Sequence, residues 1–379
     1  MNPIRILHVL YSMNRGGTEA MLMNYYRNID RDKLQFDFLL AFPGKSDYEE
    51  EIIRMGGRIY RIPGLNIWRF FPYVRSINDF FKSHNEYKIV HAHVSSYGSI
   101  VLYFARKYQI PVRICHSHNA SSGNGLKGYL RSLPRLFFRK QGTDFFSCGQ
   151  QAALWLYGES YCSKNEIKLL NNAIAVETYT YDKQTREKVR TRLSIPDNSF
   201  LIGHVGRFTI QKNHSYLLEI FRSLKESCPQ AILLLIGDGP LRTDIERKIN
   251  EMDLTGSVIL TGVVENVPDY LQAMDVFVFP SFFEGLSVSL VEAQAAGLKI
   301  FTSSTVDKET SMTDLISYLS LEDGASKWAA RILESGRTYE RKDTSESIRK
   351  SGYDIKEKSG WLESFYLEKT VKINNYLYG

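Results

Sequence analysis

The sequence predicts an α/β fold with two Rossmann-like domains, each built on a parallel β-sheet, facing each other across a deep cleft. Short apolar runs alternate with segments of helical periodicity, many of these runs end in glycine or polar residues, and the pattern restarts near residue 200. Ligands of open parallel sheets bind beyond the carboxyl ends of the strands. The loops that follow the strands are therefore where functional residues are expected.

The first half carries five predicted strands. The first is followed by a turn at Asn14–Gly17 and by a helical pattern over Thr18–Asn28. The later runs each precede a polar or glycine-containing loop. The five predicted strands are Ile4–Tyr11, Gln35–Ala41, Lys88–His93, Val112–His116 and Asp144–Cys148.

A second series of strands begins at Phe200. The residues between 172 and 199 carry many charges and little apolar periodicity, which indicates the connection between domains. We predict one domain over 1–175 and a second over 176–359, with a final amphipathic helix at about 360–379 that packs back on the first. The strands of the second series are Phe200–Val205, Ala231–Ile236, Ser257–Leu260, Val276–Phe279 and Leu298–Thr302.

Composition and charge indicate an ordinary globular protein whose first half is basic. Hydrophobic residues make up 43% and charged residues 24% of 379 residues, as in ordinary globular proteins. No signal-peptide or membrane-spanning pattern is found, and four scattered cysteines indicate reduced thiols, so we expect a cytoplasmic location. Residues 1–172 hold 23 basic and 13 acidic residues, whereas residues 173–379 hold 25 and 29. The first half is therefore expected to meet an anionic partner.

The stretch Val276–Gly297 contains the most informative loop. A strand is followed by Glu284, then by a helix that Ser287 is placed to cap and that holds Glu292. The N–H groups of a first helical turn lack intrahelical partners and attract anions, so a diphosphate fits there. The two carboxylates could then accept hydrogen bonds from hydroxyl groups. An ordinary loop with two solvated glutamates remains the alternative.

Two cations follow the first strand of the second series. Gly206 allows a close turn, and Arg207 and Lys212 come directly after it. Such cations could neutralise a diphosphate leaving group that gains charge as its bond to a sugar breaks. Two surface cations in a loop are the plainer interpretation.

Gly16 and Gly17 follow the first predicted strand and open a helix, a position that also suits an anion. The surrounding sequence is not G-x-G-x-x-G and is not a Walker A motif, which argues against a nicotinamide or P-loop site. A plain tight turn is the alternative.

Two His-x-His pairs end strands of the first half. The alternation of a strand places His91 and His93 on one face, and likewise His116 and His118. Without cysteine or carboxylate ligands this pattern is weaker than established zinc spacings, so we predict no metal and favour a histidine that acts as a base or orients a hydroxyl. Asp30-Arg31-Asp32 matches a bare D-x-D pattern but precedes a strand, so we interpret it as a solvated turn.

Together these motifs resemble the retaining glycosyltransferases of family 4, which have the GT-B fold. The resemblance rests on the E-x7-E pair in PSFFEGLSVSLVEAQAAG, and on GHVGRF, QKNH, LLLIGDGPL, GGTE and HSHN. It covers nearly the whole chain, is most specific over 200–300, and is closest to the exopolysaccharide and capsule enzymes. Ser287 stands where many relatives have proline.

The resemblance implies a role for each matched residue. Arg207 and Lys212 would bind the donor diphosphate, Glu284 the donor sugar and Glu292 the ribose. The backbone from Gly285 through Leu286 and Ser287 to Val288 would contribute to the donor site, with N–H groups from its last three residues. Gly16, Gly17 and Gly206 would lie close to the ligands, and His116 or His118 would bond the transferred sugar.

The implied activity is metal-independent transfer of a sugar, with retention, from a nucleotide-diphosphate sugar. The resemblance favours a UDP-sugar as substrate, no separate cofactor, and a polyprenyl-diphosphate-linked or saccharide acceptor in surface polysaccharide synthesis. The alternatives are a nucleotide-sugar epimerase or phosphorylase on the same fold and a catalytically silent sugar- or lipid-binding subunit. No nucleic-acid-binding motif is present.

Two segments of the first half mix basic and aromatic residues, Leu65–Lys82 and Leu126–Lys140. Arg131, Arg135 and Arg139 recur every four residues and would form a basic stripe on a helix, which suits anionic headgroups. We therefore expect a peripheral association with the inner face of the plasma membrane, with a solvated helix face as the alternative.

Overall fold

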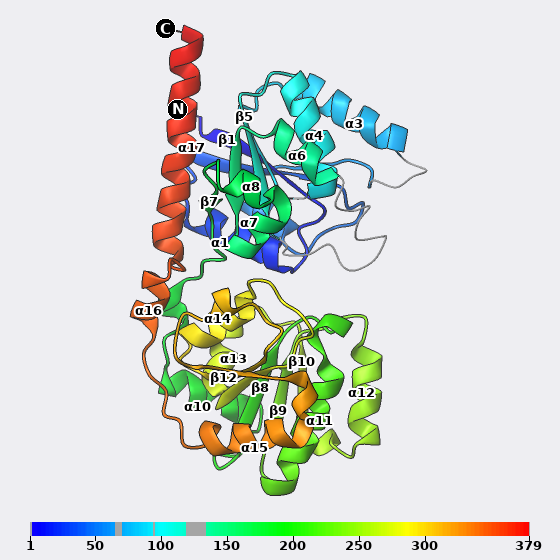
Figure 1. Ribbon diagram of the computed structural model, residues 1–379, viewed down its shortest axis with the longest axis vertical. Coiled ribbons are helices and arrows are strands. Elements are labelled where there is room, and N and C mark those ends of the chain that lie inside the picture. Colours follow the sequence, from blue (N-terminus) through cyan, green and yellow to red (C-terminus); the bar gives the residue numbers. More distant parts are fainter. Residues whose placement is uncertain (1, 65–69, 94, 119–133, 379) are drawn as a thin grey trace. The chain divides into compact units, whose positions relative to one another are not determined.

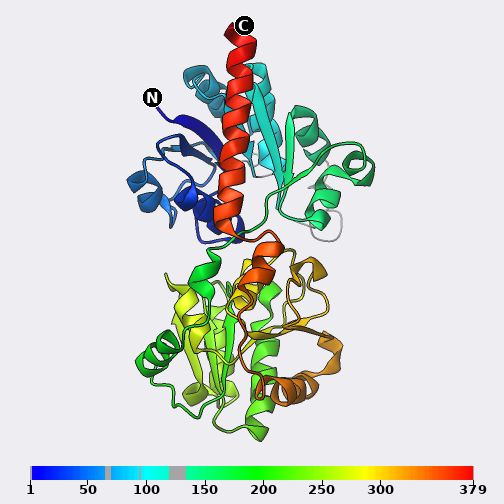
Figure 2. The same ribbon diagram turned by 90° about the vertical axis from the view of Figure 1, so that its left-hand side faces the viewer.

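The computed structural model describes residues 2–64, 70–93, 95–118 and 134–378, which fall into two compact units (Figures 1 and 2). Unit 1 comprises Met1–Ala173 and Asp354–Gly379, and unit 2 comprises Ile174–Tyr353. The sequence predicts boundaries after 175 and 359, and the structure divides the chain after 173 and 353.

Unit 1 is built on a seven-stranded parallel sheet in the order β3-β2-β1-β4-β5-β6-β7. Every residue of β2 is buried, because helices cover both faces of the sheet. The sequence analysis missed the two short edge strands, β3 and β7. The strands are β1 (Ile4–Leu10), β2 (Leu34–Leu40), β3 (Ile59–Arg61), β4 (Ile89–Ala92), β5 (Val112–Ser117), β6 (Asp144–Ser147) and β7 (Lys168–Leu169).

The helices of unit 1 include the C-terminal helix α17 (Ile355–Tyr378), which lies against α1 (Gly17–Asn28) (Figure 2). It begins earlier than predicted because the Asp354 carboxylate accepts a hydrogen bond from the Lys356 N–H at 2.8 Å and caps it. The other helices are α2 (Glu49–Arg54), α3 (Phe70–Ser83), α4 (Ser95–Lys107), α6 (Pro134–Gln141), α7 (Gln150–Tyr157) and α8 (Glu159–Cys162).

Unit 2 is built on a six-stranded parallel sheet in the order β10-β9-β8-β11-β12-β13. Separate apolar cores lie on its two faces, one around Phe277 and one around Trp328. The strands are β8 (Leu201–Val205), β9 (Ile232–Ile236), β10 (Val258–Gly262), β11 (Val276–Phe279), β12 (Lys299–Ser303) and β13 (Ile316–Leu319). Four residues long and only half-buried, β13 was not predicted.

The helices of unit 2 connect these strands. Gly297 follows the end of α14 with φ +66°, a left-handed conformation that stops the helix. The position also favours glycine because a Cβ there would lie 2.4 Å from the Lys342 carbonyl oxygen. The helices are α9 (Val176–Tyr179), α10 (Lys183–Arg192), α11 (His214–Ser227), α12 (Arg242–Glu251), α13 (Val267–Ala273), α14 (Val288–Ala295), α15 (Ala325–Gly336) and α16 (Ser345–Lys350).

Both sheets have the strand order of a doubly wound Rossmann fold. The order reverses between β1 and β4 in unit 1 and between β8 and β11 in unit 2. Ligands of such sheets bind at this switch point, beyond the carboxyl ends of the strands. The predicted α/β fold with two Rossmann-like domains is confirmed, and a cleft between them remains a prediction.

Among the described residues, no helix is long and apolar enough to cross a membrane.

Candidate functional site

The predicted donor residues of unit 2 lie at the carboxyl ends of β8 and β11. These two strands are neighbours, with Val276 opposite Ile202. The loop after β8 holds Gly206 and Arg207, and the loop after β11 holds Glu284. The topology therefore brings together two loops that are more than seventy residues apart in the sequence.

Lys212 and Glu284 form an ion pair between these loops. Lys212 Nζ lies 2.8 Å from Glu284 Oε1, and both side chains are largely buried. The ammonium group also lies 4.4 Å from the centre of the Phe279 ring, a cation–π contact. The two residues that the sequence analysis assigned to the diphosphate and the sugar are thus already in contact.

Arg207 is exposed in the loop after β8 that leads to Lys212, and no carboxylate lies within ion-pair distance of it in the described part of the chain. The guanidinium group is permanently charged and offers five N–H donors. It is therefore available to an anionic ligand without first breaking an internal ion pair.

The loop after β11 is held rigidly by hydrogen bonds that sequence reasoning did not foresee. The Gln211 side chain donates to the Phe283 carbonyl oxygen at 3.0 Å, and the Phe282 N–H donates to the Gln211 carbonyl oxygen at 2.9 Å. From the other side, the Thr305 hydroxyl donates to the Ser281 carbonyl oxygen at 3.0 Å. A loop fixed in this way orients Glu284 before a ligand arrives.

Gly285, Leu286, Ser287 and Val288 lead from that loop into α14. A Cβ at Gly285 would meet no atom within 4 Å, so open space adjoins the backbone there. Ser287 takes the predicted N-cap position, but its side chain makes no capping hydrogen bond. The serine hydroxyl therefore does not occupy the first-turn N–H groups of α14. The Leu290 N–H donates to the Ser287 carbonyl oxygen at 3.1 Å, which leaves the N–H groups of Val288 and Ser289 for an anion.

Glu292 lies in α14, where Tyr179 of α9 donates a hydrogen bond from its hydroxyl to Glu292 Oε1 at 2.7 Å. Burial raises the pKa of this carboxyl to about 7, and the hydrogen bond from Tyr179 opposes the shift. Tyr179 is a part of the site that sequence reasoning missed, since it lies 113 residues before Glu292.

Glycines let the loops after β8 and β9 approach closely. Gly237 has φ +134°, and a Cβ on it would lie 2.2 Å from the Gly206 carbonyl oxygen. A Cβ at Gly206 would crowd Lys212 Cδ at 3.3 Å. A larger residue at Gly237 would therefore displace the backbone at Gly206, whereas one at Gly206 would press on the Lys212 side chain.

In unit 1, Gly16 and Gly17 lie between β1 and α1, as predicted. Gly16 occupies the N-cap position without a side chain to cap the helix, and a Cβ at Gly17 would meet no atom within 4 Å. The N-terminus of α1 therefore carries first-turn N–H groups that no side chain of the N-cap residue covers.

The two histidines at the end of β5 are placed differently. His116 is 1% exposed and its Nε2 has no hydrogen-bond partner in the described residues. His118 follows the strand, keeps part of its surface exposed, and bonds His93 through its Nε2. Of the two alternatives left open by the sequence, His118 is the one with exposed surface, and its contact with a ligand remains a prediction.

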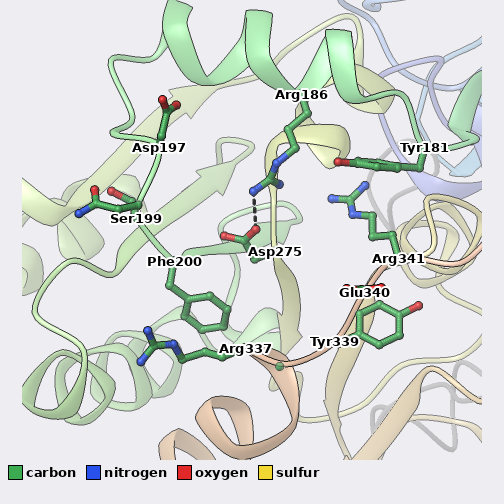
Figure 3. Close-up of a pocket in the computed structure, with 12 residues that line it drawn as sticks. Tyr181, Arg186, Asp197, Ser199, Phe200, Asp275, Arg337, Tyr339, Glu340 and Arg341 are labelled. Carbon is green, nitrogen blue, oxygen red and sulfur yellow. Dashed lines mark hydrogen bonds and ion pairs between the residues drawn. The ribbon is translucent and has the colours of Figure 1, made fainter.

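A separate pocket of unit 2 lies at the opposite ends of the strands (Figure 3). It is lined by Phe200 and Asp275, which precede β8 and β11, and by Arg186 and Arg341. Arg186 donates to the Asp275 carboxylate at 2.6 Å, and Arg341 donates to the Leu271 carbonyl oxygen at 2.7 Å. The pocket is therefore not the site that the strand ends define.

The fold and these strand-end residues define a GT-B glycosyltransferase, and comparison with known proteins agrees. Residues 185–311 match the family model described as glycosyl transferases group 1. EpsF of Bacillus subtilis strain 168 is 37% identical over 98% of both chains, and the capsular polysaccharide biosynthesis glycosyltransferase CapH of Staphylococcus aureus is 26% identical over 97% of this chain and all of CapH. The chain belongs to the group 1 glycosyltransferases.

Solved structures share this fold. The Anabaena protein Alr3699/HepE in complex with UDP-glucose matches 96% of this chain and 99% of its own, with a TM-score of 0.76 at 14% identity. The structure of WaaG, a glycosyltransferase involved in lipopolysaccharide biosynthesis, matches 95% of this chain and 99% of its own, with a TM-score of 0.69 at 15% identity. At this level of identity the likeness establishes the fold.

Proposed function

We propose that the enzyme transfers a sugar from a UDP-sugar, with retention of configuration and without a metal ion, to a polyprenyl-diphosphate-linked or saccharide acceptor of surface polysaccharide synthesis. The observation that carries this proposal is the arrangement of the Lys212–Glu284 ion pair and the exposed Arg207 in the two loops that follow β8 and β11. It supplies two cations and a helix N-terminus for a diphosphate, with a carboxylate for sugar hydroxyls.

The names of relatives support the substrate classes. The Escherichia coli relative, 24% identical over 79% of this chain, is a galactosyltransferase that uses UDP-Gal and a diphosphoundecaprenol-linked GlcNAc. A nucleotide-diphosphate sugar donor and a diphosphate-linked acceptor would both be anionic. This agrees with the basic character of the first half of the chain.

In the proposed reaction the bond between the anomeric carbon and the diphosphate oxygen breaks, and UDP leaves with the electron pair. The acceptor hydroxyl attacks the anomeric carbon from the same face, and its proton passes to the departing phosphate oxygen. Arg207 and Lys212 offset the charge that grows on the diphosphate, a type of interaction worth roughly 3–4 kcal/mol per donor in other enzymes. Glu284 would orient the sugar, and Glu292 would hold the ribose.

The test is an assay of UDP-sugars with a lipid-linked acceptor, in which the product anomer is read by NMR in the presence of EDTA. We expect the anomeric configuration of the donor in the product and an unchanged rate with EDTA. An inverted product or a rate lost with EDTA would refute the corresponding part of the proposal. Formation of a 2-epimer without acceptor would favour the epimerase alternative.

We further propose that unit 1 associates with an anionic membrane surface through α3 and α6. Phe71 on α3 and Phe137 on α6 are 84% and 66% exposed, and α6 ends in Arg139 and Lys140. Residues 65–69 and Arg131, which the sequence analysis also predicted to meet the membrane, lie outside the described residues. Exposed aromatic rings beside basic groups are typical of helices that lie in a membrane interface.

Flotation with vesicles that contain phosphatidylglycerol tests this association. The wild-type chain should float, and Phe71→Ser with Phe137→Ser should reduce the floating fraction. Phe283→Ser, at an exposed phenylalanine of unit 2, is the matched control. Wild-type protein that stays at the bottom of the gradient would refute the association.

A further inference from the structure

Five imidazoles gather on one face of the sheet of unit 1. Their rings are packed closely, with centroids 4.3 Å apart for His91 and His93 and 4.0 Å apart for His116 and His118. The side chains of four of them, His8, His91, His93 and His116, are at most 6% exposed. The cluster comprises His8 of β1, His91 of β4, His93 just after β4, His116 of β5 and His118 just after β5.

Hydrogen bonds divide the cluster into two chains. In the first, His8 Nδ1 lies 3.0 Å from His93 Nε2, and His93 Nδ1 lies 2.8 Å from His118 Nε2. In the second, His116 Nδ1 lies 3.0 Å from His91 Nε2, and His91 Nδ1 lies 2.7 Å from the Tyr366 hydroxyl of α17. Each hydrogen bond joins a ring nitrogen either to a nitrogen of another imidazole or to the Tyr366 hydroxyl oxygen.

The imidazoles of the first chain are neutral, because burial lowers the pKa of His93 well below 6.5 and those of His8 and His118 to about 3. A neutral imidazole has one N–H donor and one acceptor nitrogen. Each link needs one proton, so the tautomer of one ring fixes the tautomers of the others. The chain as a whole can take only two arrangements.

The buried end of the chain selects between them. His8 Nε2 has no hydrogen-bond partner in the described residues and faces the aromatic environment of Phe36, whose ring centroid lies 4.2 Å from that of His8. A buried N–H without an acceptor is rarer in proteins than an acceptor without a donor. His8 Nε2 is therefore the acceptor, and His8 donates from Nδ1 to His93.

We propose that His8 and His93 are positioning residues that hold His118 as its Nδ1–H tautomer, so that His118 presents a hydrogen-bond donor, and not a base, to the ligand. His93 donates from Nδ1 to His118 Nε2, which leaves the His118 proton on Nδ1. The role of His118 at the sugar rests on the proposed function, whereas its tautomer does not. In the second chain the free nitrogen, His116 Nε2, is buried, so that chain presents nothing to a ligand.

The same nitrogens explain why the cluster is not assigned as a metal site. Two groups have ligand atoms within 4.8 Å of one another, and both contain His93. Both nitrogens of His93 are already used in links of the chain. A metal ion bound by either group would have to break at least one of these hydrogen bonds.

The test is a two-bond ¹H–¹⁵N correlation spectrum of the histidine side chains in the full-length protein, which reports the protonated ring nitrogen directly. The spectrum is recorded between pH 6 and 8 without ligand, and signals are assigned with single-histidine variants. We expect a protonated Nδ1 and an unprotonated Nε2 for His8, His93 and His118. His118 as the Nε2–H form, both forms in exchange, or a metal-bound nitrogen that EDTA releases would overturn the proposal.

Variants of His93 separate positioning from folding. His93→Leu removes the donor to His118, which should then shift to the Nε2–H form that a free histidine prefers in water. His93→Asn keeps an N–H donor at the place of Nδ1 and should retain the wild-type tautomer. Tyr366→Phe cuts the other chain and is the matched control. An unchanged His118 spectrum in folded His93→Leu would contradict the proposal, and a separate UDP titration shows independently whether the donor site works.

Discussion

Glu292 is a carboxylate whose environment opposes its charge. The folded protein raises its pKa to about 7, whereas an unfolded chain gives about 4.5. Between these two values the unfolded state releases a proton that the folded state keeps, so the free energy of unfolding falls as the pH rises from 4.5 to 7. Because the residue is partly exposed, we expect this shift to lower the free energy of unfolding at pH 8 by roughly 1–3 kcal/mol.

Glu292→Gln should therefore stabilise the ligand-free protein at pH 8 by roughly 1–3 kcal/mol, with a smaller gain at pH 5.5. The amide keeps an oxygen that can accept the Tyr179 hydroxyl but carries no charge. Urea unfolding at the two pH values measures the difference. Glu284→Gln is the control, because that carboxylate is paired with Lys212 and should gain no stability.

The same carboxylate should make UDP affinity depend on pH. If ribose hydroxyls donate to Glu292, binding favours the charged form, and UDP should bind more tightly as the pH rises from 6 to 8. Glu292→Gln should remove this part of the pH dependence in a calorimetric titration. An equal pH dependence in both proteins would show that Glu292 is not the group involved.

Single residues also mark where sequence reasoning stopped. The pair Glu284 and Glu292 and the cations Arg207 and Lys212 were predicted, since their loops follow strands. Tyr179 was not, because only the folded chain brings α9 beside α14. His8 was predicted only as a residue of the first strand, and its link to His93 depends on strand pairing that one sequence does not reveal.

At the scale of elements, the end of α13 depends on arginines from other parts of unit 2. Arg341 donates to the carbonyl oxygens of Leu271 at 2.7 Å and Gln272 at 3.1 Å, and Arg186 donates to that of Ala273 at 2.9 Å. The last carbonyls of a helix lack intrahelical partners, so these cations cap α13. Burial lowers the pKa of Arg341 to about 9.

Arg341→Leu should destabilise unit 2 by about 2–3 kcal/mol, because it leaves buried carbonyl oxygens without donors. Arg341→Lys should recover only part of this loss, since lysine cannot bond several carbonyls in one plane. Urea unfolding gives the values. UDP binding by the folded variant should be unchanged, since Arg341 lies at the opposite ends of the strands from Lys212, and a weakened affinity would contradict that separation.

Elements were predicted where their sequence pattern is strong. The buried strands and α14 were found with ends within a few residues. In contrast, β3, β7 and β13 were missed because they are short edge strands without a fully buried residue, so they lack a strong apolar pattern. The segments predicted to meet a membrane lie partly in residues 65–69 and 119–133, outside the described chain. There the prediction stands without a structural test.

At the scale of the whole molecule, buried neutral histidines make unit 1 sensitive to acid. His8, His91, His93 and His116 have pKa values lowered by burial, to about 3 for His8, whereas an unfolded histidine has 6.5. Below pH 6.5 the unfolded state binds protons that the folded state excludes. Each such histidine lowers the free energy of unfolding by about 1.4 kcal/mol per pH unit in that range.

Unit 1 should therefore lose stability between pH 6.5 and 4 before unit 2, where the buried histidines are His204 and His214. Hydrogen exchange resolved by peptide, at pH 7, 6 and 5, measures the two units separately. We expect faster opening of the peptides of β1, β4 and β5 at pH 5, after correction for the intrinsic exchange rate. Earlier opening of unit 2 would contradict this account.

The central claim is that the strand ends of unit 2 bind a nucleoside diphosphate without a metal. The most direct measurement is the thermal stabilisation of the protein by UDP, GDP, ADP and CMP in EDTA, with Arg207→Ala and Glu292→Ala as variants and Arg341→Lys as control. A diphosphate at 100 times its dissociation constant should add about 2.7 kcal/mol. Stabilisation by UDP that both site variants lose and the control keeps is the predicted result. Stabilisation by no nucleotide, or only with a divalent metal, would contradict the claim.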